Sequence, residues 1–155
     1  MHGTWEANHA MHDCDLMINL GARFDDRVTG KVSAFSPKSK KIHLDIDASQ
    51  INKIVRVDLG IVGDARLALR EIIRFWKTQK HQVQSAALKE WWKQIDVWRG
   101  KKSLAYRNSD SIIKPQYAID RLYELTKHRK DVYVTTEVGQ HQMWAAQRFR
   151  FEEPN

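Results

Sequence analysis

The sequence predicts an α/β fold, in which a partial, Rossmann-like parallel sheet is followed by helices and one further strand–helix unit. Two features predict it: short apolar runs that end in Gly, Asp or Thr, and amphipathic stretches of helical period between them. The runs are continuous rather than alternating, which favours strands covered on both faces, as in a parallel sheet. They are fewer than the roughly five or six strands of a complete doubly wound sheet, so we expect only part of one.

Three full strands and one short strand are predicted. The full strands are Asp15–Leu20, Lys41–Ile46 and Asp131–Thr135, and the short strand is Ile61–Val62. Because ligands of open α/β sheets bind at the carboxyl ends of the strands, the residues that follow these runs are the candidate binding residues.

Five helices are predicted around the strands. The first follows Thr4, a favourable N-cap residue, and the second follows Asp64, which precedes an apolar stripe. A third helix runs from about Ser85 to Lys102 and carries tryptophans at helical spacing. The fourth opens with Pro115 in its first turn, and the fifth follows Gly139.

Composition places the chain among folded proteins. Its 155 residues are 42% hydrophobic and 29% charged, which fits one domain or two small ones and excludes a disordered chain. The single cysteine, Cys14, excludes an internal disulfide framework and a cysteine-based zinc cluster. The sequence has no apolar run of about 20 residues and opens without a signal-peptide pattern, so we expect a cytoplasmic chain without membrane association.

The formal net charge of +7 is unevenly distributed. Residues 74–130 carry 14 Lys/Arg against 5 Asp/Glu, whereas residues 1–73 carry 10 of each kind. The excess therefore lies on predicted helices and away from the motifs, and no nucleic-acid reading element accompanies it. We expect solvated helix faces, and a basic helical module that binds nucleic acid or acidic partners is the alternative from a different functional class.

The segment Gly21–Arg27 directly follows the first predicted strand. Gly21 allows close approach of the backbone to a ligand, and Arg23 is suited to clamp a diphosphate. Asp25 or Asp26 can pair with Arg27 or accept a hydrogen bond from a ribose hydroxyl. The segment is not a GxGxxG fingerprint, and a charged turn with local ion pairs is the purely structural alternative.

Two acidic turns follow the next strands. Asp45 and Asp47 lie about 20 residues after Gly21, where a ribose-binding carboxylate is expected in dinucleotide sites. They also share one face of a strand, which leaves a metal site or simple capping as alternatives. Gly63 and Asp64 repeat the pattern, with an N-cap role as the structural alternative for Asp64.

Two further sets of residues contain residue types that binding sites use. The early cluster of His2, His9, His12 and Cys14 is not expected to bind metal, because His9 and His12 share a helix face that Cys14 does not. Gly139 and the helix start that follows it, with Gln140 and His141, have the backbone N–H groups of an anion site suited to phosphate.

Five segments of the chain carry a resemblance to a known family. They are Met1–Thr4, Gly21–Lys31, His43–Asp47, Pro115–Ile119 and Val138–Gln147. In this order and spacing they resemble the catalytic, large-subunit family of acetolactate synthase, also called acetohydroxyacid synthase. The resemblance covers nearly the whole chain, and RFDDRVTGK together with GQHQMWAAQ makes it specific.

The resemblance implies a piece of a larger enzyme with three α/β domains. Residues 1–76 resemble the latter half of its FAD-binding central domain, and residues 77–114 resemble the helical connector between domains. Residues 115–155 resemble the first strand and helix of the pyrophosphate-binding domain. The chain opens on one motif and ends just after another, so we expect an internal fragment.

The resemblance also implies the cofactors thiamine diphosphate, Mg²⁺ and a largely non-redox FAD. The implied reaction condenses two pyruvates to 2-acetolactate and CO₂, or pyruvate with 2-oxobutyrate, in branched-chain amino acid biosynthesis. The implied FAD contacts are Met1, His2, Gly3, Gly21, Ala22, Arg23, Phe24, Asp25, Asp45, Ile46, Asp64 and Ala65. Asp26 and Arg27 are placed toward the substrate channel, and Gln140 and His141 against thiamine diphosphate. No catalytic residue and no metal ligand is assigned.

Two parts of the family's machinery lie outside this sequence. The glutamate that promotes ylid formation belongs to the first domain, and the segment that holds Mg²⁺ lies after Asn155. We therefore expect the chain alone to be inactive and to bind FAD weakly, whereas the full enzyme forms a large-subunit homodimer with a possible regulatory subunit. Another thiamine diphosphate-dependent carboligase is the alternative within the superfamily.

Overall fold

The computed structural model describes residues 3–79 and 83–151, which form two compact units. The first consists of the described residues from 5 to 101, and the second of residues 3–4 and 102–151. The first unit holds a sheet with helices α1 to α4, and the second holds α5 and α6. We describe each unit by itself.

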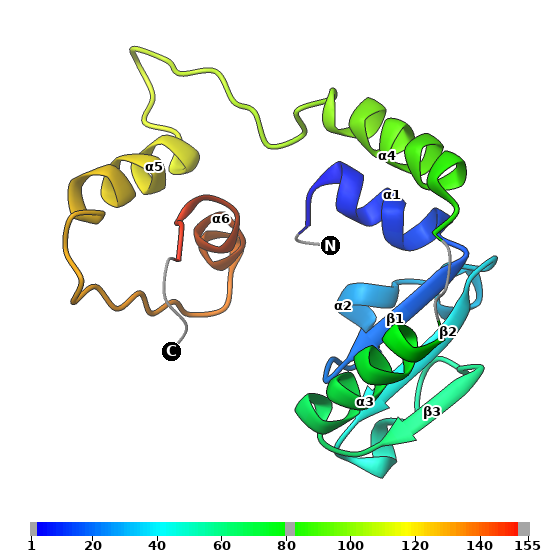
Figure 1. The fold of residues 1–155 in the computed structure, drawn as a ribbon. Coiled ribbons are helices and arrows are strands. Elements are labelled where there is room, and N and C mark those ends of the chain that lie inside the picture. The colour runs from blue at the N-terminus through cyan, green and yellow to red at the C-terminus, as the bar shows by residue number, and fades with distance from the viewer. Residues whose placement is uncertain (1–2, 80–82, 152–155) are drawn as a thin grey trace. The chain divides into compact units, whose positions relative to one another are not determined.

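The first unit contains a three-stranded parallel sheet in the order β1-β2-β3 (Figure 1). The strands are Leu16–Leu20, Lys40–Asp45 and Leu59–Val62. The register places Ile18 opposite Ile42, and Leu44 opposite Ile61. The sheet confirms the predicted α/β class and its parallel strands, and β3 is two residues longer at its start than the sequence predicted.

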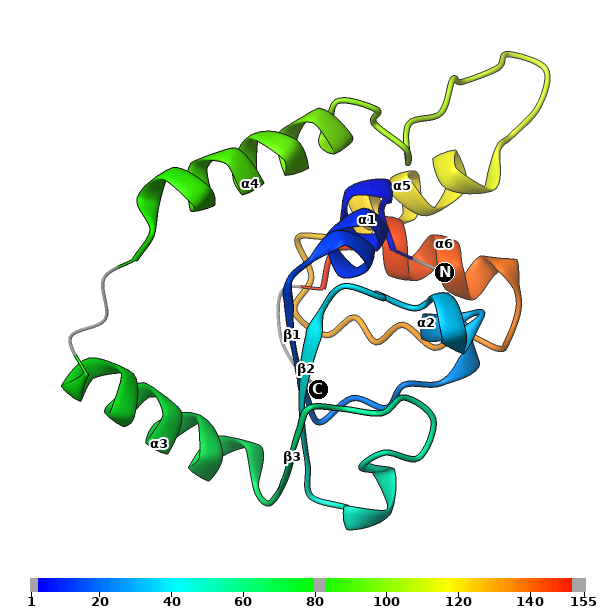
Figure 2. The same ribbon diagram turned by 90° about the vertical axis from the view of Figure 1, so that its right-hand side faces the viewer.

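The first unit also contains four helices and two short 3₁₀ turns, which lie before, between and after the strands in the sequence. The helices are α1 (Trp5–Asp13), α2 (Asp26–Thr29), α3 (Ala65–Thr78) and α4 (Ser85–Arg99), and the 3₁₀ turns are Val32–Ala34 and Ala48–Gln50. Helix α1 packs against α4. Figure 2 shows the strands edge-on, with the loop after β1 turning to one side of the sheet, where it carries α2.

The core of the first unit is centred on β2, the middle strand. Leu44 and His43 are fully buried on opposite faces of it. Strands β1 and β3 are the edges of the sheet, and Leu16, Ile18 and Leu20 of β1 are 39–53% exposed. The expectation that all strands are covered on both faces is therefore wrong for β1, because these three side chains alternate along the strand and so share one face, which the described residues leave open.

The second unit is held together by a polar network around Arg148. Helix α5 (Pro115–Thr126) packs against α6 (Gln140–Arg148). The Arg148 guanidinium lies 4.5 Å from the centre of the Tyr106 ring and donates to Asp120 Oδ2 at 3.0 Å and to the Leu104 carbonyl. The Tyr106 hydroxyl donates to the same Asp120 oxygen at 2.8 Å, and this bond raises the pKa of Tyr106 above its usual value.

The predicted strand Asp131–Thr135 is wrong. These residues are extended but belong to no strand, and Tyr133 is 89% exposed. A parallel strand needs hydrogen bonds from a neighbouring strand, and the described part of the second unit contains no strand to supply them.

No helix in the described ranges combines the length and apolar character that a membrane span requires.

Candidate functional site

The loops that follow the three strands meet at the carboxyl edge of the sheet. The backbone N–H of Gly21, just after β1, donates to the Leu44 carbonyl of β2 at 2.8 Å. The N–H of Gly63, just after β3, donates to the Asp45 carbonyl at 2.9 Å. The structure therefore brings together three of the segments that the sequence singled out, as the parallel topology predicts.

A tight turn shapes the loop after β1. Gly21 has φ +62°, a conformation that favours glycine, and no other atom lies within 4 Å of where its Cβ would be. The Asn19 side-chain amide donates to the Ala22 carbonyl and closes the turn. Sequence reasoning gave no role to Asn19, since an asparagine inside an apolar strand has no distinctive signature.

Phe24 anchors this loop in the core. Its ring is 7% exposed and makes edge-on contacts with Phe35, at 5.8 Å between ring centres, and with His43, at 5.1 Å. Because this side chain is packed in the core, it fixes the loop to the sheet, and only the backbone of Phe24 is available to contact a ligand.

The charged residues beside Phe24 face outward. Arg23 Nε pairs with Asp25 Oδ2 at 3.0 Å, and the Arg23 side chain is 74% exposed. Asp25 also caps α2 by accepting from Val28 N at 3.2 Å, while Asp26 and Arg27 are exposed in the first turn of that helix. The structure therefore pairs Asp25 with Arg23, whereas the sequence suggested Arg27 as the partner of Asp25 or Asp26.

Asp45 and Asp47 have different surroundings after β2. Asp45 is buried, and its Oδ1 accepts from the Asp47 N–H at 2.9 Å. Asp47 is exposed and accepts from Ser49 N at 2.8 Å and from Ser49 Oγ at 2.9 Å, and these bonds lower the pKa of Asp47. Ile46 between them is 75% exposed. The Asp47 carboxylate is thus used by hydrogen bonds within the turn, whereas Asp45 is the last residue of the strand.

A buried histidine adjoins Asp45. Both ring nitrogens of His43 are buried without a hydrogen-bond partner, and Nε2 lies 3.7 Å from Asp45 Oδ2. Lys41, His43 and Asp45 alternate along β2 and so share one face of the sheet. The sequence analysis included His43 in a motif but did not predict this polar face. The signal that could have revealed it is the polar residue at every second position of the strand.

Asp64 is the N-cap of α3. Its Oδ1 accepts from Leu67 N at 2.9 Å, which confirms the capping role that the sequence gave as the structural alternative. Ala65 opens the helix beside it. Asp64 is exposed, and this cap does not use its second carboxylate oxygen.

The residues at this edge include chemical groups of the kind that dinucleotide sites use. They combine an exposed guanidinium at Arg23, carboxylates at Asp45 and Asp64, and a glycine turn that leaves room for a ligand to approach the backbone. The described residues hold no group of three or more His, Cys, Asp or Glu side chains arranged to bind a metal. Of the residues expected before α1, Gly3 is exposed and groups with the second unit and not with the sheet, whereas Met1 and His2 lie outside the described residues.

The second unit presents a different candidate at the start of α6. Gln140 and His141 are exposed in its first turn, where backbone N–H groups are available to an anion. A Cβ on Gly139 would lie 2.9 Å from His141 Cε1, so glycine allows the imidazole to lie close to the backbone. The predicted helix start after Gly139 is confirmed.

Comparison with known proteins identifies similar chains. Residues 1–72 match the family described as thiamine pyrophosphate enzyme, central domain. The chain is 42% identical to the acetolactate synthase isozyme 3 large subunit of Escherichia coli (strain K12) and 43% identical to the acetolactate synthase large subunit of Haemophilus influenzae. It is 46% identical to the acetolactate synthase large subunit of Buchnera aphidicola subsp. Schizaphis graminum. Each match covers 99% of this chain and 26% of the relative, so the chain spans about a quarter of the relatives' length.

Proposed function

Because this chain is a homologue of acetolactate synthase large subunits along 99% of its length, we propose that it is the part of such an enzyme that holds FAD and one end of thiamine diphosphate. The whole enzyme would condense two pyruvates, or pyruvate and 2-oxobutyrate, for branched-chain amino acid biosynthesis. The observation that carries the proposal is the convergence of the loops after β1, β2 and β3 at one edge of the sheet.

The sheet edge is the proposed flavin site. Arg23 would bind the diphosphate with its guanidinium, while Asp25 holds that guanidinium in place. Asp45 would accept from a ribose hydroxyl, since it ends a strand beside the glycine turn. The proposed FAD contacts also include Met1, His2, Gly3, Gly21, Ala22, Phe24, Ile46, Asp64 and Ala65, with Phe24 acting through the backbone.

The remaining proposed contacts are with the substrate and with thiamine diphosphate. Asp26 and Arg27, exposed at the start of α2, would face the substrate channel. Gln140 and His141 would contact thiamine diphosphate with the donors of the first turn of α6. When bound, thiamine diphosphate supplies the electron sink for joining 2-oxo acids.

The chain by itself is proposed to be inactive. The activating glutamate and the Mg²⁺ segment of the family would come from other parts of the full enzyme. In that enzyme we propose a cytoplasmic location, a homodimer of large subunits and an associated regulatory subunit.

A chimera tests the proposal. Residues 1–155 replace the homologous segment of the Escherichia coli isozyme 3 large subunit, and acetolactate formation from pyruvate is measured with thiamine diphosphate, Mg²⁺ and FAD. We expect acetolactate from the chimera and none from the isolated chain. A folded chimera without product contradicts the proposal, and product from the isolated chain contradicts its inactivity.

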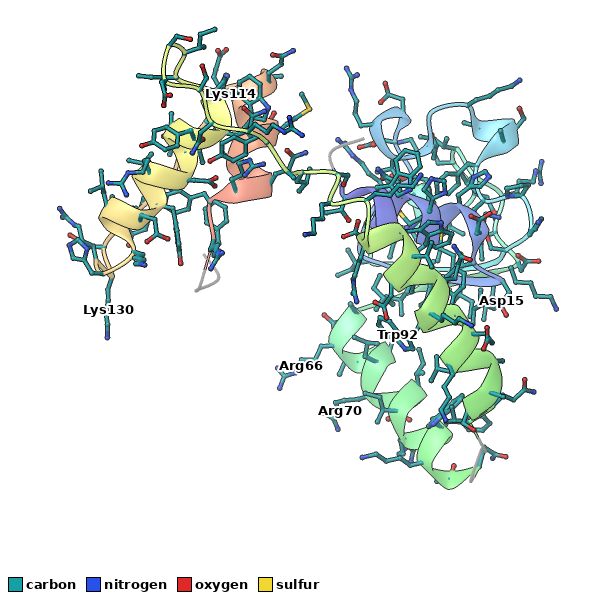
Figure 3. All side chains as sticks on the ribbon, turned by 90° about the horizontal axis from the view of Figure 1, so that it is seen from above. Asp15, Arg66, Arg70, Trp92, Lys114 and Lys130 are labelled. Carbon is teal, nitrogen blue, oxygen red and sulfur yellow. The ribbon has the colours of Figure 1, made fainter. Side chains whose placement is uncertain are left out.

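The flavin assignment is tested separately in the same chimera. We expect Arg23→Ala to weaken FAD binding about tenfold, measured by quenching of flavin fluorescence, because one charge-assisted contact is lost. Arg70→Ala is the matched control, since Arg70 projects from α3 into solvent (Figure 3). Equal effects of the two substitutions contradict the assignment. A chimera that is active without FAD indicates the alternative, a flavin-independent carboligase.

A further inference from the structure

The polar network around Arg148 takes no part in the proposed cofactor contacts. Arg148 is the last residue of α6, and its guanidinium donates to Asp120 Oδ2 of α5 at 3.0 Å and to the Leu104 carbonyl. The Tyr106 hydroxyl donates to the same Asp120 oxygen at 2.8 Å. Because these partners of Arg148 lie 28 and 44 residues away along the chain, the network joins the end of α6 to two distant segments of the second unit.

The burial of Arg148 points to a role other than stability. Its side chain is 12% exposed, and among the described residues its Nε is buried without a hydrogen-bond partner. A buried N–H without a partner costs free energy, and a buried ion pair is often no more stabilising than apolar side chains of similar volume. The planar guanidinium is, however, well suited to fix a position, because its donors have a rigid, directional geometry.

The opposite end of α6 is less firmly held. In the part of the chain that the structure describes, the helix start has no side-chain cap, and residues 131–138 before it belong to no strand. Val138 is 86% exposed. Gln140 and His141 are exposed in the first turn, about 12 Å along the helix axis from Arg148. Because consecutive helical turns are joined by hydrogen bonds, the anchored end determines where these two side chains lie.

We propose that Arg148 is a positioning residue that, through α6, holds Gln140 and His141 in the place where they contact thiamine diphosphate. This inference rests on the proposed function, which assigns the start of α6 to that cofactor. A displacement of about 1 Å weakens such contacts strongly, because hydrogen bonds act over a narrow range of distance and angle. Arg148 therefore affects the binding of the cofactor through the helix and not by touching it.

Arg148→Met tests the proposal in the chimera, since methionine fills much of the same volume without the directional donors. We expect thiamine diphosphate to bind about tenfold more weakly in the presence of Mg²⁺, measured by isothermal titration calorimetry. The affinity for FAD, assigned to the first unit, should change by less than about twofold. Arg121→Ala, an exposed arginine on α5, is the control and should leave both affinities unchanged. Unchanged thiamine diphosphate binding in Arg148→Met, or an equal loss for both cofactors, overturns the proposal.

A second substitution tests whether the network acts as one unit. Asp120→Asn removes the charge that holds the guanidinium, and it should weaken thiamine diphosphate binding in the same direction as Arg148→Met. In the Arg148→Met background it should add little, because the contact is already lost. Fully additive effects overturn the proposal.

The wild-type chimera separates this proposal from the proposed function. If it does not bind thiamine diphosphate, the proposed function is contradicted, and the positioning role with it. If it binds the cofactor and Arg148→Met binds equally well, the positioning role alone is contradicted.

Discussion

At the scale of single residues, the segment after β1 contains one buried anchor among exposed charged residues. Phe24 is buried, whereas Arg23 and Asp26 beside it are exposed. The sequence predicted a ligand loop here, with a charged turn as the alternative. It could not show which side chain turns inward, because that depends on Phe35 and His43, which follow later in the chain.

Removing the Phe24 ring should destabilise the first unit. We expect Phe24→Ala to lower the free energy of unfolding by about 3 kcal/mol, since truncating a buried phenylalanine leaves a cavity. Phe75→Ala is the control, because Phe75 is 63% exposed on α3. Urea unfolding monitored by circular dichroism measures both, and equal losses would show that Phe24 is not an anchor.

Asp47 should make stability depend on acid pH. Hydrogen bonds from Ser49 lower the pKa of Asp47 in the folded state, so its contribution is present above the ordinary aspartate pKa of 3.8. It is lost as the pH falls through the lowered value. We expect Asp47→Ala to reduce the melting temperature at pH 7 and to have less effect at pH 3. Ser49→Ala should act in the same direction, and a larger Asp47→Ala effect at pH 3 would contradict this account.

At the scale of helices and strands, the sequence predicted most of what local chemistry determines. Asp64 and Pro115 mark helix starts by their own side chains, and both helices begin there. The strand prediction for residues 131–135 was wrong because it rested on apolar content alone, whereas a strand also needs a neighbouring strand as its hydrogen-bonding partner. The buried polar face of β2 was missed because the packing of His43 depends on residues outside its own strand.

The cap of α3 gives a prediction at this scale. Asp64→Ala should destabilise the first unit by about 1 kcal/mol, because Leu67 N loses its hydrogen-bond acceptor at the helix start. Asp64→Asn should retain most of the stability, since asparagine is also a good N-cap. Thermal unfolding followed by circular dichroism measures the difference. Equal losses for alanine and asparagine would show that the capping bond is not the cause.

At the scale of the whole molecule, the basic excess of residues 74–130 is partly neutralised by acidic neighbours. Arg74, Lys93, Arg99, Lys127 and Arg129 each pair with an acidic residue two or three positions away. These pairs are exposed and contribute little to stability. They set an acidic group beside each of these five basic side chains, and the sequence has no reading element of the kind that accompanies a nucleic-acid footprint.

This distribution predicts weak binding to nucleic acid. We expect a fluorescent DNA duplex to bind the chain no more tightly than about 10⁻⁵ M at 150 mM salt, in the range of non-specific contacts. Fluorescence anisotropy at several salt concentrations measures the number of phosphates neutralised, because the affinity of a basic surface falls steeply with salt. Sub-micromolar binding with a slope that reflects six or so phosphates would favour the basic helical module. In that case, basic side chains such as Arg74 and Lys93 would bind phosphates in place of their acidic partners. Glu71→Gln and Glu90→Gln, which remove those partners, would then strengthen DNA binding further.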